Sequence, residues 1–195
     1  MTQKAGTLFI NAIVLTMDGK LNQYDPGAVA VKGDSILAVG TQDEIVKEYS
    51  ADETIDCGGK VLMPGLVNAH THVPMTLLRG LADDLRLDVW LMGYMLPVER
   101  EFVTPEFVRL GTLLACAEQI RSGITTFNDM YFFEDAIAQA TADAGMRAVC
   151  GQSVMKYPAP DAPSFEVSLA MAREFIMKWK GHPLIVPAVA PHAPY

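Results

Sequence analysis

The sequence predicts an α/β protein in which a small β-rich domain, residues 1–60, precedes the first half of a (β/α)8 barrel, residues 61–195. Three observations support this prediction. Short strand patterns joined by turns fill the first part of the chain, and strand and helix patterns alternate after it. A His-x-His pair then ends the first apolar strand of the second part, at the end of the strand where barrels carry their chemistry.

The first 60 residues are expected to form a small β-sandwich. The predicted strands cover residues 8–16, 28–32, 35–39 and 52–57. Gly33-Asp34 is typical of a two-residue hairpin turn with glycine first. Thr41-Gln-Asp-Glu44 resembles a capping box that opens a short helix. This domain contains no histidine and no cluster of acids, so we do not expect it to carry the chemistry.

The rest of the chain alternates between strands and helices. The predicted strands cover residues 61–72, 124–130, 146–152 and 184–190, and the predicted helices cover 104–123, 134–144 and 165–180. Apolar strands joined by helices indicate a parallel sheet, which an open doubly wound fold or a closed barrel would satisfy. No Gly-x-Gly-x-x-Gly follows a strand, which argues against the nucleotide-binding folds. A barrel takes about 250 residues, so we expect its second half beyond residue 195.

His70 and His72 follow the apolar run that begins at Val61. In a strand, side chains two positions apart point to the same face, so the two imidazoles should project together. Such a pair suits a borderline metal such as Zn²⁺, although His-x-His alone can equally be two polar residues of a loop. Polar residues also end two other predicted strands: Asn128, Asp129 and His192. Their convergence favours a metal-assisted site.

Composition excludes several other classes of protein. The chain has a net charge of −8, with 50% hydrophobic and 19% charged residues, and no basic face suited to nucleic acid. No apolar run approaches the ~18–20 residues of a membrane span, and no export signal opens the sequence. Three distant cysteines are typical of reduced thiols. We therefore expect a cytoplasmic protein that binds a small-molecule substrate and neither nucleic acid nor membrane.

Several motifs resemble one known family. Pro64-Gly-Leu-Val-Asn-Ala-His-Thr-His72 resembles the first-strand motif of the amidohydrolase superfamily. Further segments are similar to the branch that contains methylthioadenosine/S-adenosylhomocysteine deaminases and their triazine chlorohydrolase relatives. These segments are residues 72–84, Leu96-Pro-Val-Glu99, residues 122–131 and Pro191-His-Ala-Pro-Tyr195. The resemblance covers nearly the whole chain.

The resemblance implies roles for four residues. His70 and His72 would bind one divalent metal, usually Zn²⁺, with iron or manganese as alternatives. Glu99 would contact the sugar hydroxyls of a nucleoside, and His192 would touch the substrate near the reacting centre. A third histidine ligand, a catalytic glutamate and a metal-binding aspartate would lie on later strands. No catalytic residue is therefore expected within residues 1–195, and this segment alone should be inactive. The resemblance also implies a homo-oligomer.

The residues also allow plainer interpretations. Glu99 can be a surface acid paired with Arg100, and His192 an exposed loop histidine. Asp129 can be a polar group in direct contact with the site, but it is expected to have a structural role, bonding backbone at a strand end. Trp90 and residues 92–95 can wall an apolar pocket or simply belong to the core.

One departure from the branch concerns the loop after the third strand. Residues 151–160 lack the arginine that many deaminases of this branch carry there. Gln152 or Lys156 would have to take its place, or the substrate differs.

The expected function is hydrolytic deamination of an adenine nucleoside, namely adenosine, 5′-methylthioadenosine or S-adenosylhomocysteine, with release of ammonia. Two alternatives stand beside it: a hydrolase of another aminated or chlorinated heterocycle, such as guanine or a triazine, and a non-catalytic scaffold. Glu99 favours a nucleoside, because a ribose offers two hydroxyls to one carboxylate. The intact pair of His70 and His72 favours an enzyme.

Overall fold

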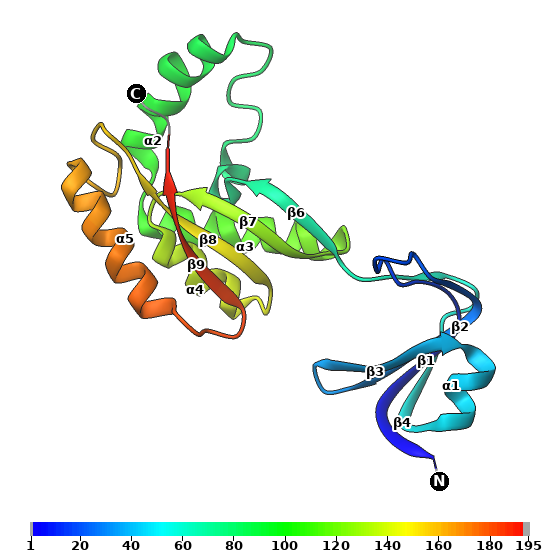
Figure 1. Ribbon diagram of the computed structural model, residues 1–195. Coiled ribbons are helices and arrows are strands. Elements are labelled where there is room, and N and C mark those ends of the chain that lie inside the picture. The colour runs from blue at the N-terminus through cyan, green and yellow to red at the C-terminus, as the bar shows by residue number, and fades with distance from the viewer. Residues whose placement is uncertain (1, 193–195) are drawn as a thin grey trace. The chain divides into compact units, whose positions relative to one another are not determined.

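The computed structural model describes residues 2–192, which form two compact units, Met1–Pro64 and Gly65–Tyr195 (Figure 1). The single strand predicted over residues 61–72 is wrong. Strand β5 (Val61–Leu62) pairs with the first unit, and β6 (Leu66–Thr71) belongs to the second. Between them lies Pro64, which has no N–H to give to a ladder. Gly65 follows it, and a Cβ there would lie 2.2 Å from the side chain of Thr125, so only glycine permits this approach.

The first unit is a five-stranded sheet in the order β3-β2-β1-β4, with β5 also beside β1. Its elements are β1 (Gln3–Leu15), β2 (Gln23–Lys32), β3 (Ser35–Thr41), α1 (Gln42–Glu48) and β4 (Tyr49–Asp56). The predicted hairpin is confirmed, since Lys32 pairs with Ser35 across Gly33-Asp34. The predicted capping box is also present at Thr41 and Glu44. Within residues 2–64 the structure describes one sheet, so the sandwich remains a proposal.

The second unit contains four parallel strands in chain order, β6-β7-β8-β9. The later strands are β7 (Ile124–Tyr131), β8 (Arg147–Val154) and β9 (Ile185–Pro191), and the crossover helices are α3 (Pro105–Arg121), α4 (Glu134–Asp143) and α5 (Phe165–Trp179). The predicted α/β class with a parallel sheet is confirmed. Closure into an eight-stranded barrel remains a proposal.

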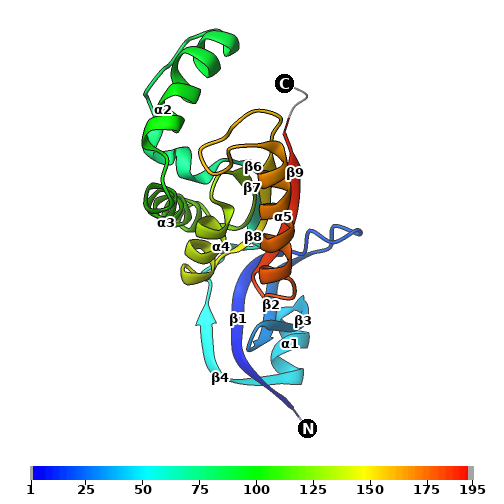
Figure 2. The ribbon, with the colours of Figure 1, turned by 90° about the vertical axis from the view of Figure 1, so that its left-hand side faces the viewer.

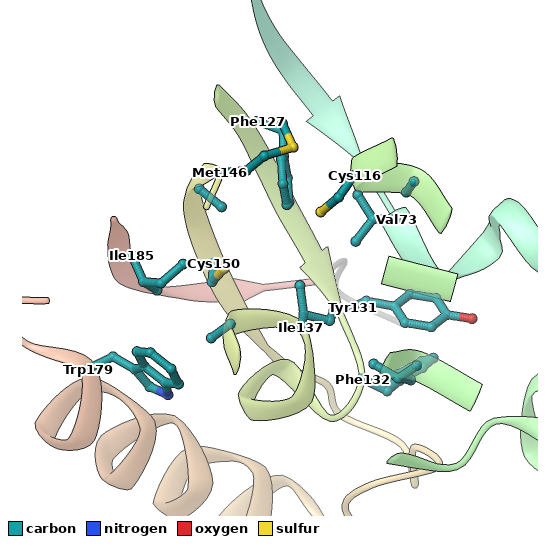
Figure 3. Packing of buried hydrophobic residues seen from close by; sticks show 14 of the residues in the cluster. Val73, Cys116, Phe127, Tyr131, Phe132, Ile137, Met146, Cys150, Trp179 and Ile185 are labelled. Atoms are coloured by element: carbon teal, nitrogen blue, oxygen red, sulfur yellow. The ribbon is translucent and has the colours of Figure 1, made fainter. Parts of the chain in front are cut away.

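The helices cover one face of this sheet. Along β7, Phe127, Asp129 and Tyr131 are buried, whereas Asn128 between them is exposed. The buried face forms one hydrophobic core with side chains from all three helices, including Cys116, Ile137 and Trp179 (Figure 3). The other face leaves apolar side chains exposed, among them Val67 and Val186. These strands are therefore not buried on both faces within the described residues.

The long connection after β6 contains three helical segments. They are the 3-10 helix η1 (Val73–Leu78), the π-helix η2 (Val89–Met95) and α2 (Leu96–Phe102). Pro97 does not break this helical run because it occupies the first turn of α2. Figures 1 and 2 show residues 89–102 beyond the carboxyl ends of the strands. In the part of the chain that the structure describes, no helix is long and apolar enough to cross a membrane.

Candidate active site

A cavity of about 220 Å³ lies in the second unit. His72, Glu99 and His192, three of the four predicted site residues, line it. They come from the end of β6, from α2 and from the residue after β9. The remaining lining is mostly apolar: Met75, Leu87, Trp90, Leu91, Met95, Leu96, Met130, Tyr131, Phe132, Ser153 and Met155. The fourth predicted residue, His70, does not line the cavity but lies next to His72.

The His72 ring is held in one orientation by strand β7. Its Nδ1 lies 2.6 Å from the backbone oxygen of Met130. A carbonyl oxygen only accepts, so Nδ1 carries a proton, and in the neutral ring Nε2 is then the nitrogen with the free lone pair. Metal-bound histidines usually have this second hydrogen bond on the ring nitrogen that does not bind the metal. The orientation of His72 therefore suits a ligand.

The two histidines fit part of a metal site. The ring centroids of His70 and His72 lie 5.1 Å apart, with the planes at 79° to each other. Imidazole nitrogens are good ligands for zinc, but a zinc site takes at least three protein ligands. Between residues 2 and 192, no group of three or more His, Cys, Asp or Glu side chains is placed to hold a metal ion. The described residues therefore supply two ligands at most.

Asp129 fixes the strand end on which the histidines lie. It is 2% exposed, and its Oδ1 accepts hydrogen bonds from the backbone N–H of Val73 at 2.8 Å and from Thr71 Oγ1 at 2.5 Å. The predicted structural role of Asp129 is confirmed by these bonds. Burial raises the pKa of Asp129 to about 7, although the hydrogen bonds from Thr71 and Val73 oppose the shift. Thr71, between the two histidines, is thereby tied to β7.

Glu99 is a buried acid and not a surface partner of Arg100. Its side chain is 6% exposed, and its Oε1 accepts a hydrogen bond from the hydroxyl of Tyr131 at 2.8 Å. Burial raises the pKa of Glu99 above its ordinary value, while the bond from Tyr131 and the charge of His72 lower it. The surface interpretation of Glu99 is therefore wrong. A buried carboxylate at a cavity wall is a candidate for recognising a polar ligand.

His192 extends the edge of the sheet into the cavity wall. Its backbone N–H donates to the oxygen of Val154 at 3.0 Å, just after the ladder between β8 and β9. The residue is half-buried, so the interpretation as an exposed loop histidine is wrong. Burial, together with the charge of His72, lowers the pKa of His192.

The predicted apolar wall is partly confirmed. Trp90 and Met95 line the cavity, whereas Met92 is 64% exposed and is not among the residues that line it. Sequence reasoning missed Tyr131, which both lines the cavity and bonds Glu99. The signal was present, because Tyr131 lies two positions after Asp129 on the same buried face of β7.

Neither suggested substitute for the missing arginine reaches this cavity. Gln152 is 2% exposed and donates to Asp161 Oδ2 at 3.0 Å. Lys156 places its ammonium 5.4 Å from the ring centre of Tyr157. No lysine or arginine lines the cavity among the described residues.

The parallel sheet and the cavity at its carboxyl edge define a parallel α/β protein with a candidate site at the strand ends, and residues 61–195 match the amidohydrolase family. The chain belongs to the amidohydrolase family. Over 194 residues it is 48% identical to the 5-methylthioadenosine/S-adenosylhomocysteine deaminase of Syntrophobacter fumaroxidans, covering 100% of this chain and 44% of that protein. The deaminase of the same name from Thermodesulfovibrio yellowstonii is 49% identical over 185 residues, or 93% of this chain and 42% of that protein.

Solved structures are also similar to this chain. The chain is 41% identical to an adenosine deaminase from Xanthomonas campestris with bound zinc, with a TM-score of 0.95, covering 100% of this chain and 44% of the other. Atrazine chlorohydrolase from Arthrobacter aurescens TC1, complexed with zinc, is 22% identical with a TM-score of 0.82 over 97% of this chain and 47% of the other. At that identity the likeness shows the fold alone. The chain spans less than half the length of the curated relatives it matches.

Proposed function

We propose that this chain is part of a metal-dependent aminohydrolase that converts an adenine nucleoside and water to the corresponding hypoxanthine nucleoside and ammonia. The observation that carries the proposal is that His72, Glu99 and His192 line one largely apolar cavity beyond the carboxyl ends of parallel strands. The names of the relatives at 48% and 49% identity support it.

His70 and His72 are proposed as ligands of one divalent metal. Zinc is the first choice because the similar adenosine deaminase structure, at 41% identity, contains it, with iron or manganese as alternatives. When bound, such a metal supplies a nucleophile at neutral pH by lowering the pKa of water from 15.7 to roughly 7. The further ligands, the catalytic glutamate, the rest of the barrel and the second sheet of the sandwich are proposed to lie beyond residue 195. By analogy with the family we also propose a cytoplasmic homo-oligomer.

Glu99 is proposed to recognise the sugar. A ribose presents two adjacent hydroxyls, and a carboxylate can accept a hydrogen bond from each. The bond from Tyr131 occupies part of Oε1 and holds the carboxylate in place, so Oε2 and the remaining lone pairs are available to a ligand. Hydrogen bonds to a charged acceptor in a buried site are the stronger kind. His192 is proposed to contact the base near the reacting carbon.

The cavity wall favours a nucleoside with an uncharged 5′ substituent. Four methionines, two of which are Met75 and Met155, line the described wall together with leucines and Trp90. An apolar wall of this kind suits the uncharged thioether substituent of 5′-methylthioadenosine.

The test is ammonia release by the purified full-length protein. Adenosine, 5′-methylthioadenosine, S-adenosylhomocysteine, guanine and a chlorotriazine are assayed at equal concentration with the metal content measured. Release from the nucleosides is expected. Metal-loaded protein that acts on guanine or the triazine alone would replace the nucleoside proposal by the heterocycle alternative. Metal-loaded protein that releases nothing from any substrate would favour a scaffold.

A variant separates the role of Glu99 from that of the histidines. Glu99→Ala should raise KM for adenosine at least tenfold while the metal content stays unchanged. Glu101→Ala, at an exposed position of the same helix, is the matched control. If Glu99→Ala loses metal in proportion to activity, the carboxylate does not have the proposed role.

A further inference from the structure

Glu134, the first residue of α4, is buried completely, with 0% of its surface exposed. Acids in the first turns of the neighbouring helices, Glu106 of α3 and Glu166 of α5, are exposed. An acid at a helix start interacts favourably with the helix dipole, and it does so without losing hydration when it is exposed. The burial of Glu134 therefore needs another explanation.

The side chain of Glu134 reaches back to the end of strand β7. Its Oε2 accepts a hydrogen bond from the backbone N–H of Tyr131 at 3.2 Å. The thiol of Cys150 also interacts with this carboxyl group and lowers its pKa, whereas Oε1 makes no hydrogen bond of normal geometry with the described residues. Buried polar atoms are nearly always satisfied, so a carboxylate placed for stability alone would have partners for both oxygens. Besides its contact with the Cys150 thiol, Glu134 restrains one backbone amide, that of Tyr131.

The turn between β7 and α4 is held by a second carboxylate. Phe133 adopts φ +55°, in the left-handed region that a bulky residue enters only when its surroundings impose it. The backbone N–H of Phe133 donates to Asp161 Oδ2 at 2.9 Å. Glu134 and Asp161 thus hold two amides of the same short turn, those of Tyr131 and Phe133.

The restrained strand end makes two hydrogen bonds to the candidate active site. The hydroxyl of Tyr131 donates to Glu99, and the backbone oxygen of Met130 accepts from His72, at 2.8 Å and 2.6 Å. A displacement of this strand end by about 1 Å would take both beyond normal hydrogen-bond length. The positions of Glu99 and of the His72 ring therefore depend on where the end of β7 lies.

We propose that Glu134 is a positioning residue of this active site. By holding the amide of Tyr131, it sets the end of β7 so that Tyr131 orients Glu99 toward the sugar and Met130 orients His72. The proposal rests on the proposed nucleoside function for the meaning of Glu99. It assigns Glu134 no contact with substrate or metal.

The test compares three substitutions in the full-length protein. Glu134→Gln keeps an oxygen that can accept from Tyr131, so KM for adenosine should stay within about threefold of the original. Glu134→Asp is one methylene too short and Glu134→Leu has no acceptor, so both should raise KM about tenfold, with a smaller fall in kcat. Glu106→Leu makes the same change at an exposed helix start and serves as control.

A second background distinguishes positioning from a general loss of stability. In Glu99→Ala protein, Glu134→Leu should raise KM by no more than about twofold, because Glu134 affects KM through the position of Glu99, which is already absent. An equal loss in both backgrounds, or an equal loss with Glu134→Gln, would overturn the proposal. If Glu134→Leu does not fold, Glu134→Asp carries the same comparison.

Failure of the nucleoside function would be recognised separately, because the unsubstituted protein would then release no ammonia from any nucleoside. The positioning proposal is tested in that case by crystal structures of the unsubstituted protein and of Glu134→Asp. A distance between the Tyr131 hydroxyl and Glu99 that grows from 2.8 Å to beyond about 3.5 Å supports it. An unchanged distance contradicts it.

Discussion

Replacing Tyr131 by phenylalanine should weaken nucleoside recognition without disturbing the metal ligands. The change removes one hydroxyl, whose bond to Glu99 is 2.8 Å long, while the ring stays in the core. The two residues are 4% and 6% exposed, so water does not replace the lost bond. Hydrogen bonds to charged groups contribute about 1.5–3 kcal/mol, and the loss of the orientation that this bond gives to Glu99 should therefore raise KM for adenosine by up to about 100-fold.

The effect should depend on pH in a defined direction. The bond from Tyr131 lowers the pKa of Glu99, so its loss leaves that pKa higher still. Glu99 then takes up a proton at a higher pH and loses its charge, and the rise in KM should grow as the pH falls.

The assay compares KM for adenosine with the inhibition constant of adenine, which has no sugar. Tyr131→Phe should change the first and leave the second within about twofold. Tyr157→Phe, at a residue that is 51% exposed and outside the cavity lining, is the control. Equal losses for adenosine and adenine would refute the assignment of Glu99 to the sugar, as would an unchanged KM.

Three further predictions concern packing, pH and metal. Gly111→Ala would place a Cβ 2.6 Å from a backbone oxygen of η1, so thermal denaturation should show a loss of about 1–3 kcal/mol, whereas Gly93→Ala, with no atom within 4 Å, should be neutral. Burial raises the pKa of Glu134 well above its ordinary 4.5. The contribution of Glu134 to the free energy of unfolding is therefore fully present below pH 4.5 and declines as the pH rises toward the raised pKa. Urea denaturation of Glu134→Gln, which cannot ionise, should show a shallower decline; an unchanged slope would mean that Glu134 does not contribute it. His70→Ala should lose most bound zinc by elemental analysis while His182→Ala retains it, because His182 accepts hydrogen bonds from the backbone of its own turn and lies outside the site.

Much of the second unit could be predicted because its signals are local. Thr104 accepts a hydrogen bond from the backbone N–H of Phe107 at the start of α3, as the Thr-Pro pair predicts. Gly123 ends the same helix with a positive φ of 76°, which glycine adopts without strain. Such residues fix element ends through contacts a few positions away. The strands between the helices are apolar, and a parallel sheet covered by helices is the arrangement that buries such strands.

The segment after β6 could not be predicted in the same way. Its helical segments η2 and α2 contain Gly93 and Pro97, residue types that normally indicate the end of a helix when only the sequence is known. The proline is tolerated because a π-helical turn precedes it and places it in the first turn of α2. The consequence for the site is direct, since this segment delivers Glu99 to the cavity wall.

The residues of the candidate site also fall into two groups, those that sequence motifs identify and those that only the structure identifies. His70, His72, Glu99 and His192 stand in motifs and could be named from the sequence. Their partners could not, because the bond between His72 and Met130 joins residues 58 positions apart and depends on the register of two strands. Motifs therefore identified the groups, whereas the structure identified what orients them.

The buried acids show why orientation is the costly part of this site. Glu99, Asp129 and Glu134 are each at most 6% exposed, and burial raises the pKa of all three. Apolar residues of similar size would often give equal or greater stability in such places. Each acid instead holds a group near the histidine pair: Asp129 fixes the loop after β6, Glu134 fixes the end of β7, and Glu99 meets Tyr131 from α2. Three unfavourable burials around one cavity are explained more simply by the needs of that cavity than by the stability of the sheet.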